Sequence, residues 1–212
     1  MKHLLGAACL GLLLAATSAG ARDKAGEFDY WLLSLSWSPQ FCVHQTSEMQ
    51  CVTPYDFVVH GLWPQHEKGY PDYCGGQREL SQNLVRRLMP LMPSEKLIQH
   101  QWRKHGSCSG LSPEDYVLTV ERARRAIVVP PTYREPTEYR RTDLDSLQAE
   151  FARFNPKLTP ETLAVQCSGR WLKEVRVCMD RDFAPRACGE DVADRCGAEI
   201  MIRPNRPPRN AP

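Results

Sequence analysis

The sequence has no strong excess of charge of either sign. Its 27 lysine and arginine residues are nearly balanced by 25 aspartate and glutamate residues, which leaves a formal net charge of +2. Net charge alone therefore does not predict binding to a polyanion. The sequence also lacks an apolar run of the ~20 residues that a membrane-spanning helix needs, and no internal repeat is visible. Membrane-spanning and repeat proteins are thus not among the classes that the sequence favours.

The apolar run that is present lies at the N-terminus. Residues 1–21 start with Lys2, continue with an apolar stretch from Leu4 to Ala16 and end with small residues. This order is typical of a cleavable secretory signal peptide. Without these residues the chain keeps 26 basic and 25 acidic side chains. We therefore expect an exported protein that no membrane holds after cleavage, periplasmic in a Gram-negative bacterium and otherwise secreted.

Closely spaced cysteine pairs of the C-x₂-C kind, which are typical of zinc ribbons, are absent. Nine cysteines occur in all, and Cys9 lies within the predicted signal peptide. The other eight are Cys42, Cys51, Cys74, Cys108, Cys167, Cys178, Cys188 and Cys196. An even number in an exported chain indicates four disulfides, although spacing alone allows 105 pairings.

A chain of 212 residues fits one domain, which we place at residues 22–202. Residues 203–212 contain three arginines, four prolines and no acid, so we expect a flexible basic tail there. An arm that binds nucleic acid is the alternative for this tail.

The apolar pattern predicts short strands and four helices. We expect strands at residues 28–37, with one buried face, and at 56–60, where Pro64 ends the second strand because it cannot continue a ladder. Further strands are expected at 163–166, 170–179 and 198–202. Helices are expected from Ser81, from Ser94 through residue 102, from Ser112 to about Val128 and from about Thr142 to Phe154, with Ser94 and Ser112 as N-caps.

One stretch, from His100 to Cys108, carries an unusual set of polar groups: His-Gln-Trp-Arg-Lys-His-Gly-Ser-Cys. If it is helical, His100, Gln101, Lys104 and His105 share a face of roughly 140°. That face holds two imidazoles, an ammonium and an amide, and Gly106 then ends the turn.

A second histidine segment supplies a partner for this face. His60 lies within Phe57-Val-Val-His-Gly-Leu-Trp-Pro64. Two histidines on opposite sides of a phosphodiester can cleave RNA, since one takes the proton of the ribose 2′-hydroxyl and the other protonates the departing 5′-oxygen. Their unperturbed pKa of about 6.5 suits both roles, and Lys104 can stabilise charge on the phosphoryl oxygens.

Other interpretations of these residues stay open at this point. A lone histidine at the end of a strand is usually a satisfied polar group, and His100 with His105 can be metal ligands. Their spacing of five differs from the four of H-E-x-x-H, however, and no cluster of acids accompanies them. Trp63 is either a core residue or a platform on which a base stacks.

The segments Phe57–Pro64 and His100–Cys108 closely resemble the two active-site segments of the ribonuclease T2 family, in the right order and at a plausible separation. The cysteines match as well, so the resemblance covers nearly the whole chain after residue 21. It implies an α+β fold with a central antiparallel sheet flanked by helices and four disulfides. It also implies an endoribonuclease that cuts single-stranded RNA through a 2′,3′-cyclic phosphate to a 3′-phosphate, without cofactor or metal.

The resemblance further implies a role for each site residue. His105 is the expected base and His60 the expected acid, while His100 contacts the phosphate and Lys104 stabilises the transition state. Gln101 departs from the family pattern, because most members have glutamate there as a catalytic group. Glutamine can donate a hydrogen bond to a phosphate oxygen but cannot store a proton. We expect an active enzyme with an altered rate or pH profile.

Residues that contact the base are implied in the same way. Trp63 is expected to stack on the base upstream of the cut, with Tyr70 or Tyr73 as its partner. Gln65 stands where some relatives have an aspartate that favours adenine, so we expect weak base preference. We expect no cleavage of DNA, and a monomer. A weakened relative that binds RNA or a protein is the alternative.

The resemblance also selects one disulfide connectivity. It implies Cys74–Cys108, Cys167–Cys196 and Cys178–Cys188, which leaves Cys42–Cys51. The Cys74–Cys108 bond would contribute on the order of 4 kcal/mol in the chain-entropy account and would tie the catalytic helix to the loop after the His60 segment.

Overall fold

The computed structural model describes residues 23–45, 47–53 and 55–205. The predicted signal peptide and most of the predicted tail lie outside these residues. Within them, no helix is long and apolar enough to cross a membrane.

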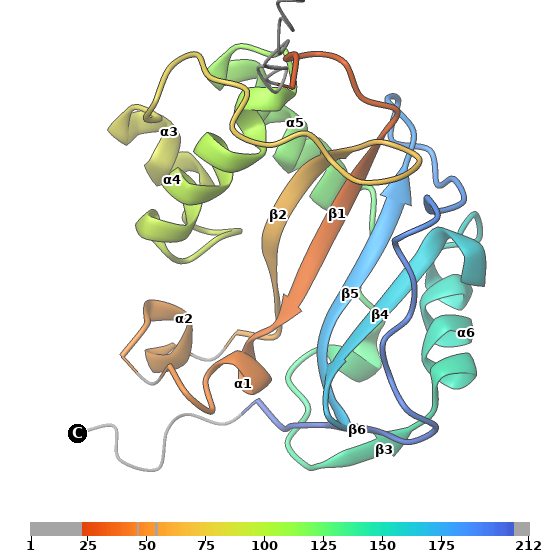
Figure 1. Cartoon of the computed structure of the whole chain (residues 1–212). Coiled ribbons are helices and arrows are strands. Elements are labelled where there is room, and N and C mark those ends of the chain that lie inside the picture. The colour runs from red at the N-terminus through yellow and green to blue at the C-terminus, as the bar shows by residue number, and fades with distance from the viewer. Residues whose placement is uncertain (1–22, 46, 54, 206–212) are drawn as a thin grey trace, which may run out of the picture.

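Six strands form one sheet at the centre of the molecule (Figure 1). Its order is β2, β1, β5, β6, β3, with β4 paired to β5 off this path. The pairs β1–β2, β1–β5, β4–β5 and β3–β6 are antiparallel, whereas β5 meets β6 in parallel. The sheet is therefore mixed, and only its main part is antiparallel as expected. The strands are β1 (Tyr30–Trp37), β2 (Phe57–Gln65), β3 (Arg140–Thr142), β4 (Leu163–Ser168), β5 (Trp171–Met179) and β6 (Ile200–Ile202).

The prediction that Pro64 ends the second strand is wrong. Strand β2 continues to Gln65, and Pro64 lies opposite Trp31 of β1. Because β2 stands at the edge of the sheet, its outer side needs no ladder hydrogen bonds and proline is tolerated there. As a consequence His60 lies in the middle of a strand.

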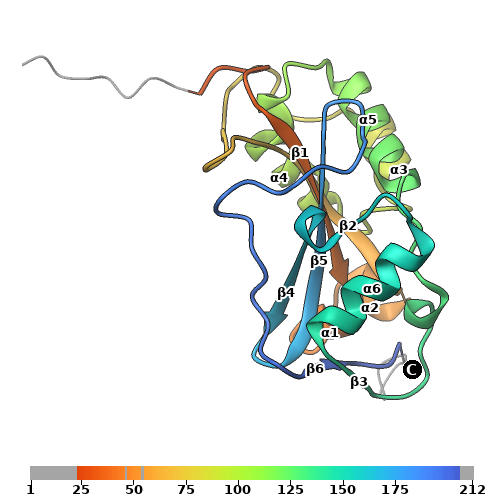
Figure 2. The same ribbon diagram turned by 90° about the vertical axis from the view of Figure 1, so that its right-hand side faces the viewer.

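Helices flank the sheet, and Figure 2 shows α5 and α6 on the same side of it. Ser94 caps α4 through a hydrogen bond from the Leu97 amide, Ser112 caps α5, and Asp143 caps α6. The short α1 and α2 were not predicted, because one turn leaves no apolar period to detect. The helices are α1 (Ser38–Phe41), α2 (Met49–Val52), α3 (Gln82–Leu88), α4 (Glu95–Lys104), α5 (Pro113–Arg125) and α6 (Leu144–Phe154).

Strand β1 is buried on both faces, not on one as its Leu/Ser alternation suggests. Leu33 and Leu35 belong to the main hydrophobic core, whereas Leu32 packs with Tyr30 and Trp63 in a second cluster. Ser34 is fully buried and donates a hydrogen bond to Glu174 of β5. A hydroxyl can occupy such a position because it has a partner. This polar contact inside the sheet lies next to His60.

Four disulfides join the cysteines in the connectivity that the resemblance implies, Cys42–Cys51, Cys74–Cys108, Cys167–Cys196 and Cys178–Cys188. Cys74–Cys108 connects the loop after β2 to the 3₁₀ turn that follows α4. The bond therefore ties the segment that carries His105 to the loop that follows the strand of His60.

The first residues of the predicted tail pack against the sheet. The backbone oxygen of Arg203 accepts a hydrogen bond from the Trp37 indole, and its guanidinium donates to Gln40 and lies over the ring of Trp171. The remainder of the predicted tail, residues 206–212, lies outside the described residues.

Candidate active site

A β-bulge sets the position of His60. Gly61 lies opposite Ser34 and Val59 lies opposite Leu35, so His60 has no partner on β1. An extra residue of this kind turns its side chain away from the regular alternation, and bulges often occur beside active sites. The bulge presents the His60 imidazole to Glu174, which β5 supplies from the other side of β1.

Glu174 holds His60 through a short hydrogen bond. Its Oε1 lies 2.9 Å from Nδ1 of His60, and its Oε2 accepts from the Arg176 guanidinium at 2.9 and 2.8 Å. Burial acts to raise the pKa of this carboxyl, but the hydrogen bond and charge of His60 together with Arg176 lower it to about 2. Glu174 is therefore ionised and keeps a proton on Nδ1, which leaves Nε2 of His60 for the substrate.

Sequence reasoning missed Glu174 and Arg176. Glu174 is 1% exposed although it lies in an apolar strand, Trp171 to Met179. A carboxylate is almost never buried without a partner. Three charged residues, Lys173, Glu174 and Arg176, inside a strand that otherwise reads as core were the available signal.

His105 lies on the side of the site opposite His60 and is buried. It follows the last residue of α4 and forms the C-cap, so the predicted helical face ends at Lys104. Burial, reinforced by the charge of Lys104, lowers the pKa of His105 to about 3. Its Nδ1 is buried and has no hydrogen-bond partner among the described residues. The imidazole is thus neutral at ordinary pH and able to accept a proton.

Gly106 does not end the helix through an unusual backbone conformation. A Cβ at this position would lie 2.6 Å from the Trp102 ring and 2.8 Å from the Tyr116 ring. Glycine is needed because these rings pack against the backbone just after His105.

Trp63 lies between the two histidines. Its ring centroid is 5.2 Å from that of His60 and 5.1 Å from that of His105, and the Arg176 guanidinium lies 5.3 Å from it. Only 9% of Trp63 is exposed. It therefore spaces the two imidazoles, and its base-stacking role stays a prediction.

The indole of Trp63 fixes the orientation of Gln101. The indole N–H donates to Oε1 of Gln101 at 2.6 Å, and an indole nitrogen can only donate. The amide nitrogen of Gln101 is then the group left to face a substrate. Gly61 makes this contact possible, because a Cβ there would lie 2.1 Å from the indole nitrogen and 2.5 Å from Oε1.

The remaining predicted residues divide into two groups. Tyr70 is 46% exposed, with its ring 5.6 Å from His105 and the Lys104 ammonium 5.3 Å from its centroid, so these three residues lie together. The backbone amide of Tyr73 donates to the backbone oxygen of Lys104 at 2.9 Å. Gln65 is buried, and one N–H of its side-chain amide donates to the Pro64 carbonyl.

His100 lines a groove on the His60 side of the site together with Glu174. Burial, followed by the charge of Lys104, lowers the pKa of His100. Among the described residues, no group of three His, Cys, Asp or Glu side chains is arranged to hold a metal ion. The site thus gathers cationic and amide donors around two imidazoles, which suits an anionic substrate.

We expect His105 to stay neutral at pH 5, where a histidine of ordinary pKa near 6.5 is mostly protonated. Folding depresses this pKa, so the unfolded chain binds more protons between pH 6.5 and 3, and stability falls as the pH drops through that window. The slope is at most about 1.4 kcal/mol per pH unit. An NMR titration of the imidazoles checks the protonation, and thermal melts of His105→Gln, expected to have a shallower slope, check the linkage.

We expect Gln101→Glu to shift the acid side of the activity profile to higher pH. The substitution keeps an acceptor for the Trp63 indole but places a carboxylate near His105, and a negative neighbour raises the pKa of an imidazole. Rates over a pH series check this result. Gln77→Glu introduces the same charge at an exposed loop position and serves as the control. An unchanged profile in Gln101→Glu would remove Gln101 from the acid–base chemistry.

Comparison with known proteins supports one family. The model of the Ribonuclease T2 family matches residues 28–188. A ribonuclease of Aeromonas hydrophila is 44% identical over 111 residues, which are 50% of this chain and 51% of that protein. A probable ribonuclease of Haemophilus influenzae is 29% identical over 76% of this chain and 61% of its own length. The chain thus spans about half to three fifths of these two relatives.

Solved structures share the fold at low identity. An RNase-related protein from Calystegia sepium superposes with a TM-score of 0.69 at 19% identity, over 85% of this chain and 99% of that one. RNase NT, solved in complex with 5′-AMP, gives a TM-score of 0.61 at 22% identity, over 84% and 99%. At these identities the similarity establishes the fold alone.

Proposed function

The chain belongs to the ribonuclease T2 family, and from this premise we propose that it is an exported endoribonuclease that cleaves single-stranded RNA without a metal. The observation that carries the proposal is the opposed setting of two histidines around Trp63. His60 is held by an ionised carboxylate, whereas His105 is buried and kept neutral. This difference suits one proton donor and one proton acceptor.

In the first step His105 takes the proton of the 2′-hydroxyl, and the 2′-oxygen forms a bond to phosphorus. The bond from phosphorus to the 5′-oxygen breaks, and Nε2 of His60 gives its proton to that oxygen. The products are a 2′,3′-cyclic phosphate and a free 5′-hydroxyl. The histidines then exchange roles. His60 takes a proton from water, and the water oxygen forms a bond to phosphorus. The bond from phosphorus to the 2′-oxygen breaks, and His105 returns its proton to that oxygen, which leaves a 3′-phosphate.

Charge on the phosphoryl oxygens increases during both steps. Lys104 supplies an ammonium beside His105, and the amide nitrogen of Gln101 supplies a neutral donor whose direction Trp63 sets. His100 and Arg176 add donors on the His60 side. Donors that are already in place lower the barrier without reorganisation during the reaction.

The placement of the substrate follows from these roles. The base upstream of the cut lies beside Trp63 and Tyr70, and the leaving nucleoside lies on the side of His60. The side-chain amide of Gln65 donates to the Pro64 carbonyl and not toward the site of the base. This hydrogen bond supports the proposal of weak base preference. Four disulfides support export, since they persist in oxidising compartments. We propose a monomer.

Product analysis on a defined single-stranded RNA tests this function. We expect a transient 2′,3′-cyclic phosphate, a later 3′-phosphate and multiple turnovers that a chelator does not reduce. An otherwise identical strand with one 2′-deoxy sugar at a cut site is expected to stay intact at that site, and DNA is expected to stay intact throughout. Cutting of DNA in a chelator-sensitive manner contradicts the mechanism. Tight RNA binding without turnover indicates the weakened binding relative instead.

A further inference from the structure

A groove of about 750 Å³ runs away from His60 on the leaving-group side. Three walls form it: the loop closed by Cys42–Cys51, the start of α4, and β5 with the end of β4. Figure 1 shows α4 on one side of this region and α1 with α2 on the other. Among the residues that line it are His60, His100 and Glu174, but not His105, Trp63 or Tyr70. The groove therefore continues the site in one direction only.

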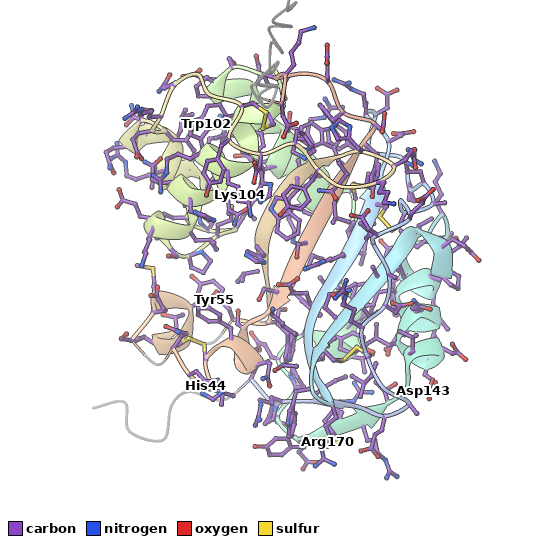
Figure 3. All side chains as sticks on the ribbon, in the orientation of Figure 1. His44, Tyr55, Trp102, Lys104, Asp143 and Arg170 are labelled. Atoms are coloured by element: carbon purple, nitrogen blue, oxygen red, sulfur yellow. A yellow bond between two sulfur atoms is a disulfide. The ribbon has the colours of Figure 1, made fainter. Side chains whose placement is uncertain are left out.

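A second β-bulge directs Lys173 into the groove. Gln166 lies opposite Glu174, and Cys167 lies opposite Leu172, so Lys173 has no partner on β4. The extra residue breaks the alternation of β5 and allows neighbouring Lys173 and Glu174 to line the same groove. Lys96 and His44 line it from the other walls, and Figure 3 places His44 on the α1 side. The groove thus offers the ammonium groups of Lys96 and Lys173 beyond the catalytic pair, with Glu48 as the further carboxylate that lines it.

An aromatic and basic cluster lies where the groove ends. Trp171 is three residues, roughly 10 Å of strand, from Glu174. The guanidinium groups of Arg203 and Arg170 lie 3.8 and 5.6 Å from its ring. Tyr139 approaches the same ring at 5.9 Å and is 56% exposed.

Direct contacts connect this cluster to the groove. Gln40 lines the groove and accepts a hydrogen bond from Arg203 at 2.7 Å. Ser168, which also lines the groove, pairs with Trp171 across the β4–β5 hairpin. Lysine and arginine beside exposed rings are what single-stranded nucleic acid requires, because the cations neutralise phosphates and the rings stack on bases.

We propose that the groove and the Tyr139–Trp171 cluster bind the RNA strand beyond the leaving nucleoside, on the 3′ side of the cut. Lys173 contacts the phosphate that follows the leaving nucleoside, and Tyr139 stacks on a base further along. This inference rests on the proposed function and deepens it, since it makes a longer RNA a better substrate than a dinucleotide. The added affinity is sequence-tolerant, because every base has a face that stacks.

Substrates extended on one side test the proposal. We compare kcat/KM for a dinucleotide, the same dinucleotide with a short 3′ extension, and the same dinucleotide with a 5′ extension of equal length. We expect the wild-type chain to favour the 3′ extension over the 5′ extension. In Tyr139→Ala we expect that advantage to fall by about fivefold or more, from the usual contribution of one stacked base. In Lys173→Ala we expect the salt slope for the 3′-extended substrate to decrease by about 0.7.

Two controls separate this proposal from the catalytic function. Both variants are expected to cleave the dinucleotide and to hydrolyse a 2′,3′-cyclic nucleotide at wild-type rates, since neither substrate is long enough to place a phosphate at Lys173 or a base at Tyr139. Lys157→Ala removes an exposed lysine outside the groove and is expected to change nothing. A 3′ extension without benefit, or one whose benefit survives in both variants, overturns the proposal. A wild-type chain that cleaves none of these substrates overturns the proposed function, and this inference with it.

Discussion

His105→Ala is expected to lower kcat on RNA by about 10²- to 10⁴-fold, the usual contribution of a positioned acid or base, and His60→Ala is expected to lower it to a similar extent. The physical reason differs between the two. In the proposed mechanism His105 is the neutral imidazole that removes the 2′-proton, and its pKa near 3 keeps it neutral at ordinary pH. In the same mechanism His60 donates the proton that the 5′-oxygen receives, and Glu174 holds its ring in place.

A change of leaving group distinguishes the two roles. A uridine 3′-phosphodiester of nitrophenol departs without protonation, because nitrophenolate is a stable anion. We expect His60→Ala to recover most of its activity on this substrate, whereas His105→Ala stays impaired because the 2′-hydroxyl still needs a base. Thermal melts at neutral pH control for folding. Equal impairment of both variants on the activated substrate would contradict the assignment of His60 as the acid.

The second large effect is expected for Glu174→Gln. The substitution keeps the volume but removes the charge that holds Nδ1–H of His60 and pairs with Arg176. We expect kcat to fall by roughly 10²-fold. Loss of a group that hydrogen-bonds a metal ligand typically costs roughly tenfold. Loss of the carboxylate that holds a catalytic histidine can cost roughly 10⁴-fold, so the expected effect lies between these two. Glu79→Gln breaks an exposed ion pair with Arg103 and is the matched control.

The split between kcat and KM shows whether Glu174 acts through His60. Without the carboxylate, the ring of His60 loses the group that holds it, so kcat is expected to fall while KM for a dinucleotide stays near the wild-type value. A purely structural role would raise KM and lower the melting temperature as well. The stability of the protein gives an independent check. Because folding lowers the pKa of Glu174 to about 2, its contribution is present above pH 4.5 and disappears as the pH falls toward 2, and Glu174→Gln lacks this dependence.

Local sequence patterns predicted most of the regular structure. Apolar periodicity and serine caps located α4 and α5, aromatic residues with alternating leucine and serine located β1, and short apolar segments located β4 and β5. The prediction of where a strand ends was wrong where that end depends on the position of the strand in the sheet. Pro64 continues β2 because that strand is at an edge, and a single sequence contains no information on which strand has a free side.

The sequence by itself determined the chemistry that the chain carries: two histidine segments, an ammonium, an amide and an even set of cysteines. These are properties of short segments, and their spacing was sufficient to indicate the family. Tertiary structure alone decided how the groups are used. Glu174 reaches His60 across β1 from 114 residues away, and two bulges determine which side chains face the substrate. The pKa of His105 depends on the side chains that bury it. The free-energy cost of burying a charge is set by those packed surroundings and not by the imidazole itself.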